Sequence, residues 1–282
     1  MTDPAMFSSQ RLYRAVAEGT PAAIASLIEP LAQDMVARIP DRLLAGRALD
    51  VGSGLGFAAT ALTRRRDAGL IGPVLALDSS AAMLAASRDR ASAGIGLLCA
   101  DLMRAPFRPA TFGLITASFA LNLSVPGPAL SRLRRLLVPG GALFIQEWAA
   151  EDALSRAFDD RFATFAPLAD VLAAEPLTAD LPHVWADQMQ DADDYHDALQ
   201  AAGFVEIHSS ESAPVTVRLP SPAPFIAYKL SWPTYFRPWS ALRDADQQQL
   251  YAQLSAMLSH HAERDGSLVW QPSLFRADAC AP

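Results

Sequence analysis

The stretch that most constrains the fold is 48–56, which reads Ala-Leu-Asp-Val-Gly-Ser-Gly-Leu-Gly. An apolar strand here contains Asp50 and runs into three alternate glycines, Gly52, Gly54 and Gly56, before an alanine-rich helix begins. Because glycine has no Cβ, the backbone of such a turn can come close to a ligand. The helix start adds free N–H groups and a partial positive charge. The stretch therefore predicts a nucleotide-type cofactor site at the carboxyl end of a parallel strand.

The dinucleotide-binding fingerprint, G-x-G-x-x-G/A, fits this turn poorly. Phe57 stands where the fingerprint needs its third small residue, and Asp50 would repel a pyrophosphate. An NAD-dependent oxidoreductase is therefore the weaker alternative.

Two later strand-like runs also end in acids. Residues 73–77 precede Asp78, and residues 95–100 precede Asp101 and Leu102. A carboxylate at the end of the second strand of a doubly wound sheet can accept hydrogen bonds from both ribose hydroxyls. The alternative interpretation is that Asp78 only caps the helix predicted from about Ser80. Further strands are predicted at 112–118 and 142–148, the second after a helix that ends before Pro-Gly-Gly at 139–141.

This order of motifs resembles the small-molecule branch of the class I S-adenosylmethionine-dependent methyltransferases. The resemblance covers 45–148 with specific motifs, and it continues more loosely through a helix that ends at Gly203. It implies an α/β, Rossmann-like, doubly wound sheet of seven strands, six parallel and one antiparallel, with a helical cap. It also implies S-adenosylmethionine as cofactor and S-adenosylhomocysteine as product.

The same resemblance implies the residues that bind the cofactor. The glycine turn would hold the methionine end, Asp78 the ribose, and Asp101 with Leu102 the adenine. Ser118 and Phe119 would line the end where the methyl group is transferred. The complete predicted set is Asp50, Gly52, Ser53, Gly54, Gly56, Asp78, Ser79, Met83, Asp101, Leu102, Ser118 and Phe119.

The remaining segments predict a cap. The expected division is an N-terminal helical cap (1–46), a cofactor-binding core (47–148), a helical insertion (149–192), a core helix and sixth strand (193–212), an aromatic-rich helical insertion (213–266), and a seventh strand with a tail (267–282). Within it we expect helices from Pro21, over 152–172 and over 244–262, and an antiparallel strand over 268–276. In the resembling family, N-terminal helices lie over the cofactor end of the sheet.

The substrate is predicted to be a small, apolar or aromatic molecule. Aromatic residues crowd the segment 222–239, where they form either the core of a cap or the wall of a flat pocket. The candidate pocket residues are Asn122, Trp148, Tyr228, Trp232, Tyr235 and Phe236.

Methyl transfer requires alignment more than side-chain chemistry, so the sequence leaves the catalytic residues unknown. Asn122 excludes a histidine base at the position that some relatives use. Glu147, at the end of the fifth strand, is the weak candidate for a proton acceptor or amine binder; an ion pair or loop hydrogen bond is the alternative. A cofactor-binding partner or sensor without turnover remains the rival hypothesis.

Composition excludes other classes. A net charge of −7 disfavours a nucleic-acid partner, and no apolar run is long enough to predict a membrane span. Two cysteines make no disulfide framework, no cluster has metal-ligand spacing, and the N-terminus does not resemble a signal peptide. A cytoplasmic protein is expected. The oligomeric state cannot be predicted.

Overall fold

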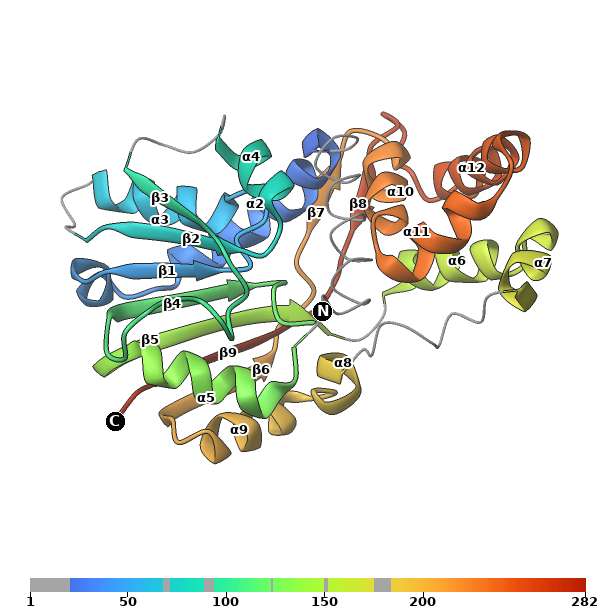
Figure 1. Ribbon diagram of the computed structural model, residues 1–282. Helices are drawn as coiled ribbons and strands as arrows, with labels where there is room; N and C mark the ends of the chain where they lie inside the picture. The colour runs from blue at the N-terminus through green and yellow to red at the C-terminus, as the bar shows by residue number, and fades with distance from the viewer. Residues whose placement is uncertain (1–20, 68–71, 89–93, 123, 150–151, 175–183) are drawn as a thin grey trace. The chain divides into compact units, whose positions relative to one another are not determined.

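The chain folds into two units (Figure 1). The structure is a computed structural model, and it describes residues 21–67, 72–88, 94–122, 124–149, 152–174 and 184–282. The described residues of the sheet unit are 28–67, 72–88, 94–122, 124–149, 184–213 and 274–282. Those of the helical unit are 21–27, 152–174 and 214–273.

The sheet unit contains a seven-stranded sheet with the order β3-β2-β1-β4-β5-β9-β6. Its strands are β1 (Ala48–Val51), β2 (Val74–Asp78), β3 (Ile95–Cys99), β4 (Phe112–Ser118), β5 (Leu137–Trp148), β6 (Val205–Glu211) and β9 (Leu274–Cys280). Strand β9 runs antiparallel to both of its neighbours, and the other six strands are parallel. The predicted fold class is confirmed.

Helices flank this sheet. They are α2 (Pro21–Ala37, whose first residues belong to the helical unit), η1 (Asp41–Ala45), α3 (Phe57–Asp67), α4 (Ala81–Arg88), α5 (Pro126–Leu136), α8 (Val184–Gln188) and α9 (Ala192–Ala201). Helix α5 begins with a proline, which needs no partner for the N–H it lacks, and a capping box of Asp191 and Asp194 starts α9. Figure 1 shows α5 and α9 together on one face. That face carries the main apolar core.

Side chains of the central strands alternate between the two faces. Leu49, Ile115 and Ile145 point into the core beneath α5 and α9. Their neighbours Asp50 and Gln146 therefore point to the opposite face, where Gln146 reaches a backbone carbonyl of α2. This alternation decides which polar side chains of the strands share a site.

The helical unit contains α6 (Ala153–Ala163), α7 (Ala166–Ala174), β7 (Val217–Leu219), α10 (Pro222–Leu230), α11 (Pro233–Ala241), α12 (Asp244–Ser259) and β8 (Leu268–Trp270). The helical structure predicted over 152–172 forms as two helices, because α6 ends at Ala163 and α7 begins at Ala166. Pro167 cannot donate the hydrogen bond that a continuous helix needs. The helix predicted over 244–262 forms as α12 and ends at Ser259.

The strand predicted over 268–276 is also two elements. Strand β8 pairs with β7 in a separate two-stranded sheet, whereas β9 enters the main sheet at Leu274. Pro272, which lacks an N–H group, lies between them. The structural division therefore differs from the expected one. The chain re-enters the sheet unit for the last time at Leu274, and α8 belongs to the sheet unit rather than to the insertion.

Candidate cofactor site

The glycine turn after β1 has the backbone that its sequence predicts. Gly52, Gly54 and Gly56 have φ values of 59°, 52° and 79°, a region that residues with a Cβ rarely adopt. A Cβ on Gly52 would lie 2.5 Å from the Cβ of Ala120, so the loop after β4 packs directly on this turn. The amide of Ser53 donates to the Leu77 carbonyl of β2 at 3.0 Å. Two neighbouring strands therefore hold the turn in place.

Asp50 lies on β1 and is buried beneath the turn. Its Oδ2 accepts a hydrogen bond from the Ala59 amide at 3.0 Å, and its Oδ1 accepts one from the Thr116 hydroxyl at 2.9 Å. Burial raises the pKa of Asp50 to about 7, against these two hydrogen bonds, which lower it. Asp50 therefore ties β1 to β4 and to the first turn of α3.

Asp78 ends β2 and also contacts the turn. Its Oδ2 accepts from the Gly54 amide and its Oδ1 from the Ser80 amide, both at 2.8 Å. The helix-capping role falls to Ser80, whose hydroxyl accepts from the Met83 amide of α4 at 3.3 Å. The alternative in which Asp78 merely caps α4 is therefore incomplete, since its second oxygen stabilises the glycine turn.

The other predicted cofactor residues follow β2 and β3. Asp101 is half-buried, and its Oδ1 accepts from the Met103 amide at 2.8 Å. Leu102 packs against the apolar core, Ser79 is exposed, and the Met83 side chain lies under Gly54. Because the carboxyl ends of parallel strands meet at one edge, these residues share the edge that holds the glycine turn.

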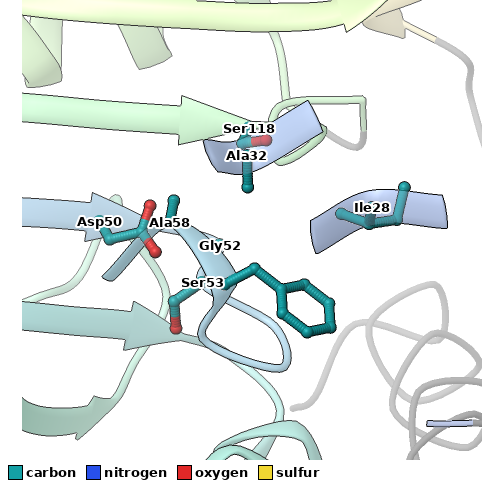
Figure 2. A pocket seen from close by; sticks show the side chains of 8 residues that line it. Ile28, Ala32, Asp50, Gly52, Ser53, Ala58 and Ser118 are labelled. Carbon is teal, nitrogen blue, oxygen red and sulfur yellow. The ribbon is translucent and has the colours of Figure 1, made fainter. Parts of the chain in front are cut away.

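A pocket opens at this edge (Figure 2). It is lined by Ile28, Ala32, Asp50, Gly52, Ser53, Phe57, Ala58 and Ser118. The Ser53 hydroxyl is buried and has no hydrogen-bond partner among the residues that the structure describes. Ile28, Ala32, Phe57 and Ala58 were not predicted as site residues, although the apolar spacing of the helix that begins at Pro21 was the signal that could have indicated the first two.

Two aromatic residues lie where β4 and β5 end. The rings of Phe119 and Trp148 stack with their centroids 4.2 Å apart and their planes 21° apart. Phe119 has a φ of 54°, which is uncommon for a residue with a large side chain. Both residues are half-buried, and Asn122 in the same loop is exposed. The edge therefore carries a stacked aromatic pair next to Ser118.

Comparisons with known proteins agree with this geometry. A family profile described as a methyltransferase domain matches residues 49–145. The ubiquinone/menaquinone biosynthesis C-methyltransferase UbiE of Paraburkholderia phymatum is 31% identical over 183 residues, which are 57% of this chain and 73% of that protein. The chain belongs to the class I S-adenosylmethionine-dependent methyltransferases. The predicted family and cofactor are confirmed.

Another relative of this methyltransferase matches a smaller share of the chain. The 2-phytyl-1,4-naphtoquinone methyltransferase of Thermosynechococcus vestitus is 40% identical over 36% of this chain and 46% of its own length. Among solved structures, a chain of the complex between the Haloferax volcanii Trm112 methyltransferase activator and the putative methyltransferase has a TM-score of 0.55. It has 17% identity, over 96% of this chain and 97% of that one. The phosphoethanolamine N-methyltransferase 2 of Haemonchus contortus, solved with S-adenosylhomocysteine, has a TM-score of 0.52 and 15% identity over 96% and 60%. These structures show the same fold.

The residues present fit S-adenosylmethionine. A Cβ on Gly54 would lie 3.4 Å from Met83 Cε, so the backbone of the turn is uncovered at this glycine. Asp78 ends β2, and Asp101 lies in the loop after β3. The unpartnered hydroxyl of Ser53 supplies a buried polar atom at the turn. Within the described ranges, no group of three His, Cys, Asp or Glu side chains could hold a metal ion, and no helix is long and apolar enough to cross a bilayer.

Glu147 of the methyltransferase lies elsewhere than the sequence suggested. It follows Gln146 on β5 and so points to the face of α5 and α9, where it is 4% exposed. Its Oε1 accepts hydrogen bonds from the amides of Ala120 and Leu121, at 2.9 and 3.0 Å. Burial raises the pKa of Glu147 to about 7. The expectation that it faces substrate is wrong, and its geometry is that of the alternative, an anchor for the loop after β4.

The aromatic-rich segment forms the interior of the helical unit. Tyr228 is buried, with its ring centroid 6.1 Å from that of Trp270 and 5.6 Å from that of Trp232. Tyr235 donates from its hydroxyl to Asp159 Oδ1 at 2.5 Å. Trp232, Tyr235 and Phe236 are half-buried. Their predicted place in a substrate pocket stays a prediction.

Proposed function

We propose that this methyltransferase transfers the methyl group of S-adenosylmethionine to a flat aromatic or quinone-type small molecule. The observation that carries the proposal is the stacked pair of Phe119 and Trp148 at the carboxyl edge of the sheet, directly after Ser118. A planar apolar ring gains from stacking on such a surface by about 0.5–1.5 kcal/mol beyond its buried area. Two relatives bear names of quinone-biosynthesis methyltransferases, which supports the same substrate class.

For the cofactor, we assign the roles that the carboxylates and the turn suit. Asp78 would accept from the ribose hydroxyls with the lone pairs that its two amide contacts leave free. Asp101 would accept from the adenine amine, with Leu102 beside the ring. S-adenosylmethionine supplies an activated methyl group. The protein then has to align the acceptor with that group and exclude water, which contributes about 7–11 kcal/mol in well-oriented reactions.

The described residues at this edge offer no evident base for a proton of the methylated substrate. Glu147 Oε1 accepts hydrogen bonds from two backbone amides, and its carboxyl group is buried on the other face of the sheet. Asn122 and Trp148 cannot accept a proton near neutral pH. An acceptor that is electron-rich without help from the protein, such as a hydroquinone or a phenolate, fits this edge best.

Calorimetric titration with S-adenosylhomocysteine, followed by turnover on matched hydroquinones, phenols and amines, tests the proposal. We expect binding in the micromolar range and methylation of the hydroquinone or phenol. The Trp148→Ala variant should have a higher KM for that substrate. The Trp148→Phe variant keeps an aromatic ring, so its KM should stay close to that of the unaltered protein. Binding without turnover on any acceptor would favour the cofactor-binding partner or sensor. Turnover on aliphatic amines alone would refute the proposed substrate class.

A small-molecule acceptor makes a nucleic-acid partner unnecessary. The absence of a nucleic-acid partner stays a prediction from the sequence, based on the net charge of −7.

A further inference from the structure

Gln146 has a buried side-chain amide, whose hydrogen bonds go to Ser118 and Leu31 rather than to the glycine turn or to Asp78 and Asp101. It lies opposite Ser118 in the register of the parallel β4–β5 pair and is fully buried. Its Nε2 donates to Ser118 Oγ at 2.8 Å and to the Leu31 carbonyl of α2 at 3.1 Å. Its Oε1 has no hydrogen-bond partner in the described part of the chain. One side chain therefore connects β4, β5 and α2.

The chemistry of these contacts fixes the direction of the Ser118 hydroxyl. The Leu31 carbonyl can only accept, so the amide of Gln146 must present its nitrogen to it. The two hydrogens of that nitrogen are then used, one on Leu31 and one on Ser118. Because Ser118 Oγ accepts from Gln146, its own hydrogen is available for a different acceptor. Ser118 lines the pocket in Figure 2.

The pocket holds a second hydroxyl of the same kind. Ser53 is 9% exposed, lines the pocket, and its Oγ has no partner within the described residues. Helix α3 begins at Phe57 in the pocket wall, and the first amides of a helix favour an anion. The oxygens of Asp50, in contrast, each accept a hydrogen bond from the protein. The pocket thus offers the hydroxyls of Ser53 and Ser118 as donors for an anionic group, next to Asp50, an acid that suits a cationic group.

We infer that Ser118, oriented by Gln146, donates its hydroxyl to the carboxylate at the amino-acid end of the cofactor, with Ser53 as a second donor. Gln146 is then a positioning residue that acts through Ser118 and does not touch the ligand. A zwitterionic amino-acid group matches the pocket because its carboxylate meets the hydroxyls and its ammonium meets Asp50. The inference rests on the proposed use of this turn for the methionine end.

The test uses two ligands that differ at this end. S-adenosylhomocysteine carries the amino-acid group, and 5′-methylthioadenosine lacks it. In calorimetric titrations, Ser118→Ala should weaken S-adenosylhomocysteine by about tenfold or more, since it removes a hydrogen bond to a charged group. Binding of 5′-methylthioadenosine should not change. Ser210→Ala, an exposed serine on β6, is the matched control and should change neither affinity.

A double-mutant cycle tests the role of Gln146. Gln146→Leu should weaken S-adenosylhomocysteine about three- to tenfold, because the Ser118 hydroxyl loses the donor that orients it. In the Ser118→Ala background the same substitution should have no further effect. If the two substitutions instead raise the dissociation constant by independent factors that multiply, the positioning role is overturned, because Gln146 would then act through α2 alone. If Gln146→Leu fails to fold, Gln146→Met serves in the same cycle, and Ser118→Ala remains decisive for the carboxylate contact.

The outcomes separate this inference from the proposed function. Tight binding of S-adenosylhomocysteine by the unaltered protein and by Ser118→Ala alike would overturn the inference and leave the function standing. An equal loss for both ligands would also overturn it, because the effect would not concern the amino-acid end. No binding of S-adenosylhomocysteine by the unaltered protein would overturn both.

Discussion

Replacing Gly52 by alanine tests how closely the loop after β4 packs on the glycine turn. Gly52 has a φ of 59°, and an alanine in that region costs about 1–2 kcal/mol. The added Cβ would lie 2.5 Å from Ala120 Cβ and 3.2 Å from Ala120 Cα, so one segment must move. Overpacking of this kind costs about 1–3 kcal/mol. We expect the free energy of unfolding to fall by about 2–5 kcal/mol in total.

Gly140 supplies the matched control. Its φ is 72°, but a Cβ there would meet no atom of the described residues within 4 Å. Gly140→Ala should therefore lower the free energy of unfolding by only about 1–2 kcal/mol, the backbone cost alone. The difference between the two variants isolates the collision with Ala120. Ala120→Gly in the Gly52→Ala background removes the nearer of the two contact atoms and should recover much of that difference.

Urea unfolding followed by circular dichroism measures these values, with comparable m-values as the condition for comparison. The Gly52→Ala variant should also bind S-adenosylhomocysteine more weakly, because the turn that contacts the ligand is displaced. Equal losses of stability for Gly52→Ala and Gly140→Ala would refute the reasoning, since the loop would then yield to the new methyl group at no cost.

Three further predictions concern buried charges. Burial raises the pKa of Asp50 and Glu147 to about 7, from ordinary values of 3.8 and 4.5, so the folded state binds these protons more tightly than the unfolded state. The free energy of unfolding should therefore fall as pH rises from about 4 to 8, by at most about 4–5 kcal/mol for Asp50 and about 3–4 kcal/mol for Glu147. A flat profile in urea titrations would contradict this. Asp159→Ala should cost about 3–5 kcal/mol, because it removes the carboxylate 3.0 Å from the buried Lys229 ammonium and leaves that charge against the rings of Phe158, Trp232 and Tyr235. Adding Lys229→Met should restore most of the loss, measured by the same method. Asp78→Ala should weaken S-adenosylhomocysteine at least about tenfold in calorimetry, and an unchanged affinity would remove Asp78 from the site.

The sequence by itself determined the parts that depend on local backbone. Strand, glycine turn and helix follow one another within 48–67, and left-handed φ angles appear at Gly52, Gly54 and Gly56 because only glycine adopts them readily. The order of strands and strand-end acids carried the resemblance to the family, and that resemblance implied the cofactor and the six-plus-one sheet. Each of these features is encoded by neighbours in the chain or by the order and spacing of the motifs along it.

The tertiary structure decided which distant side chains meet. Glu147 and Gln146 are adjacent in sequence, yet the pleat of β5 sends the first to the core under α5 and α9 and the second toward the pocket and α2. Spacing alone could not show which face held the pocket. The pairing of Ser118 with Gln146 depends on the register of two strands, and the contact between Lys229 and Asp159 joins helices seventy residues apart. Such contacts follow from the packing of whole elements, whose relative positions no local pattern specifies.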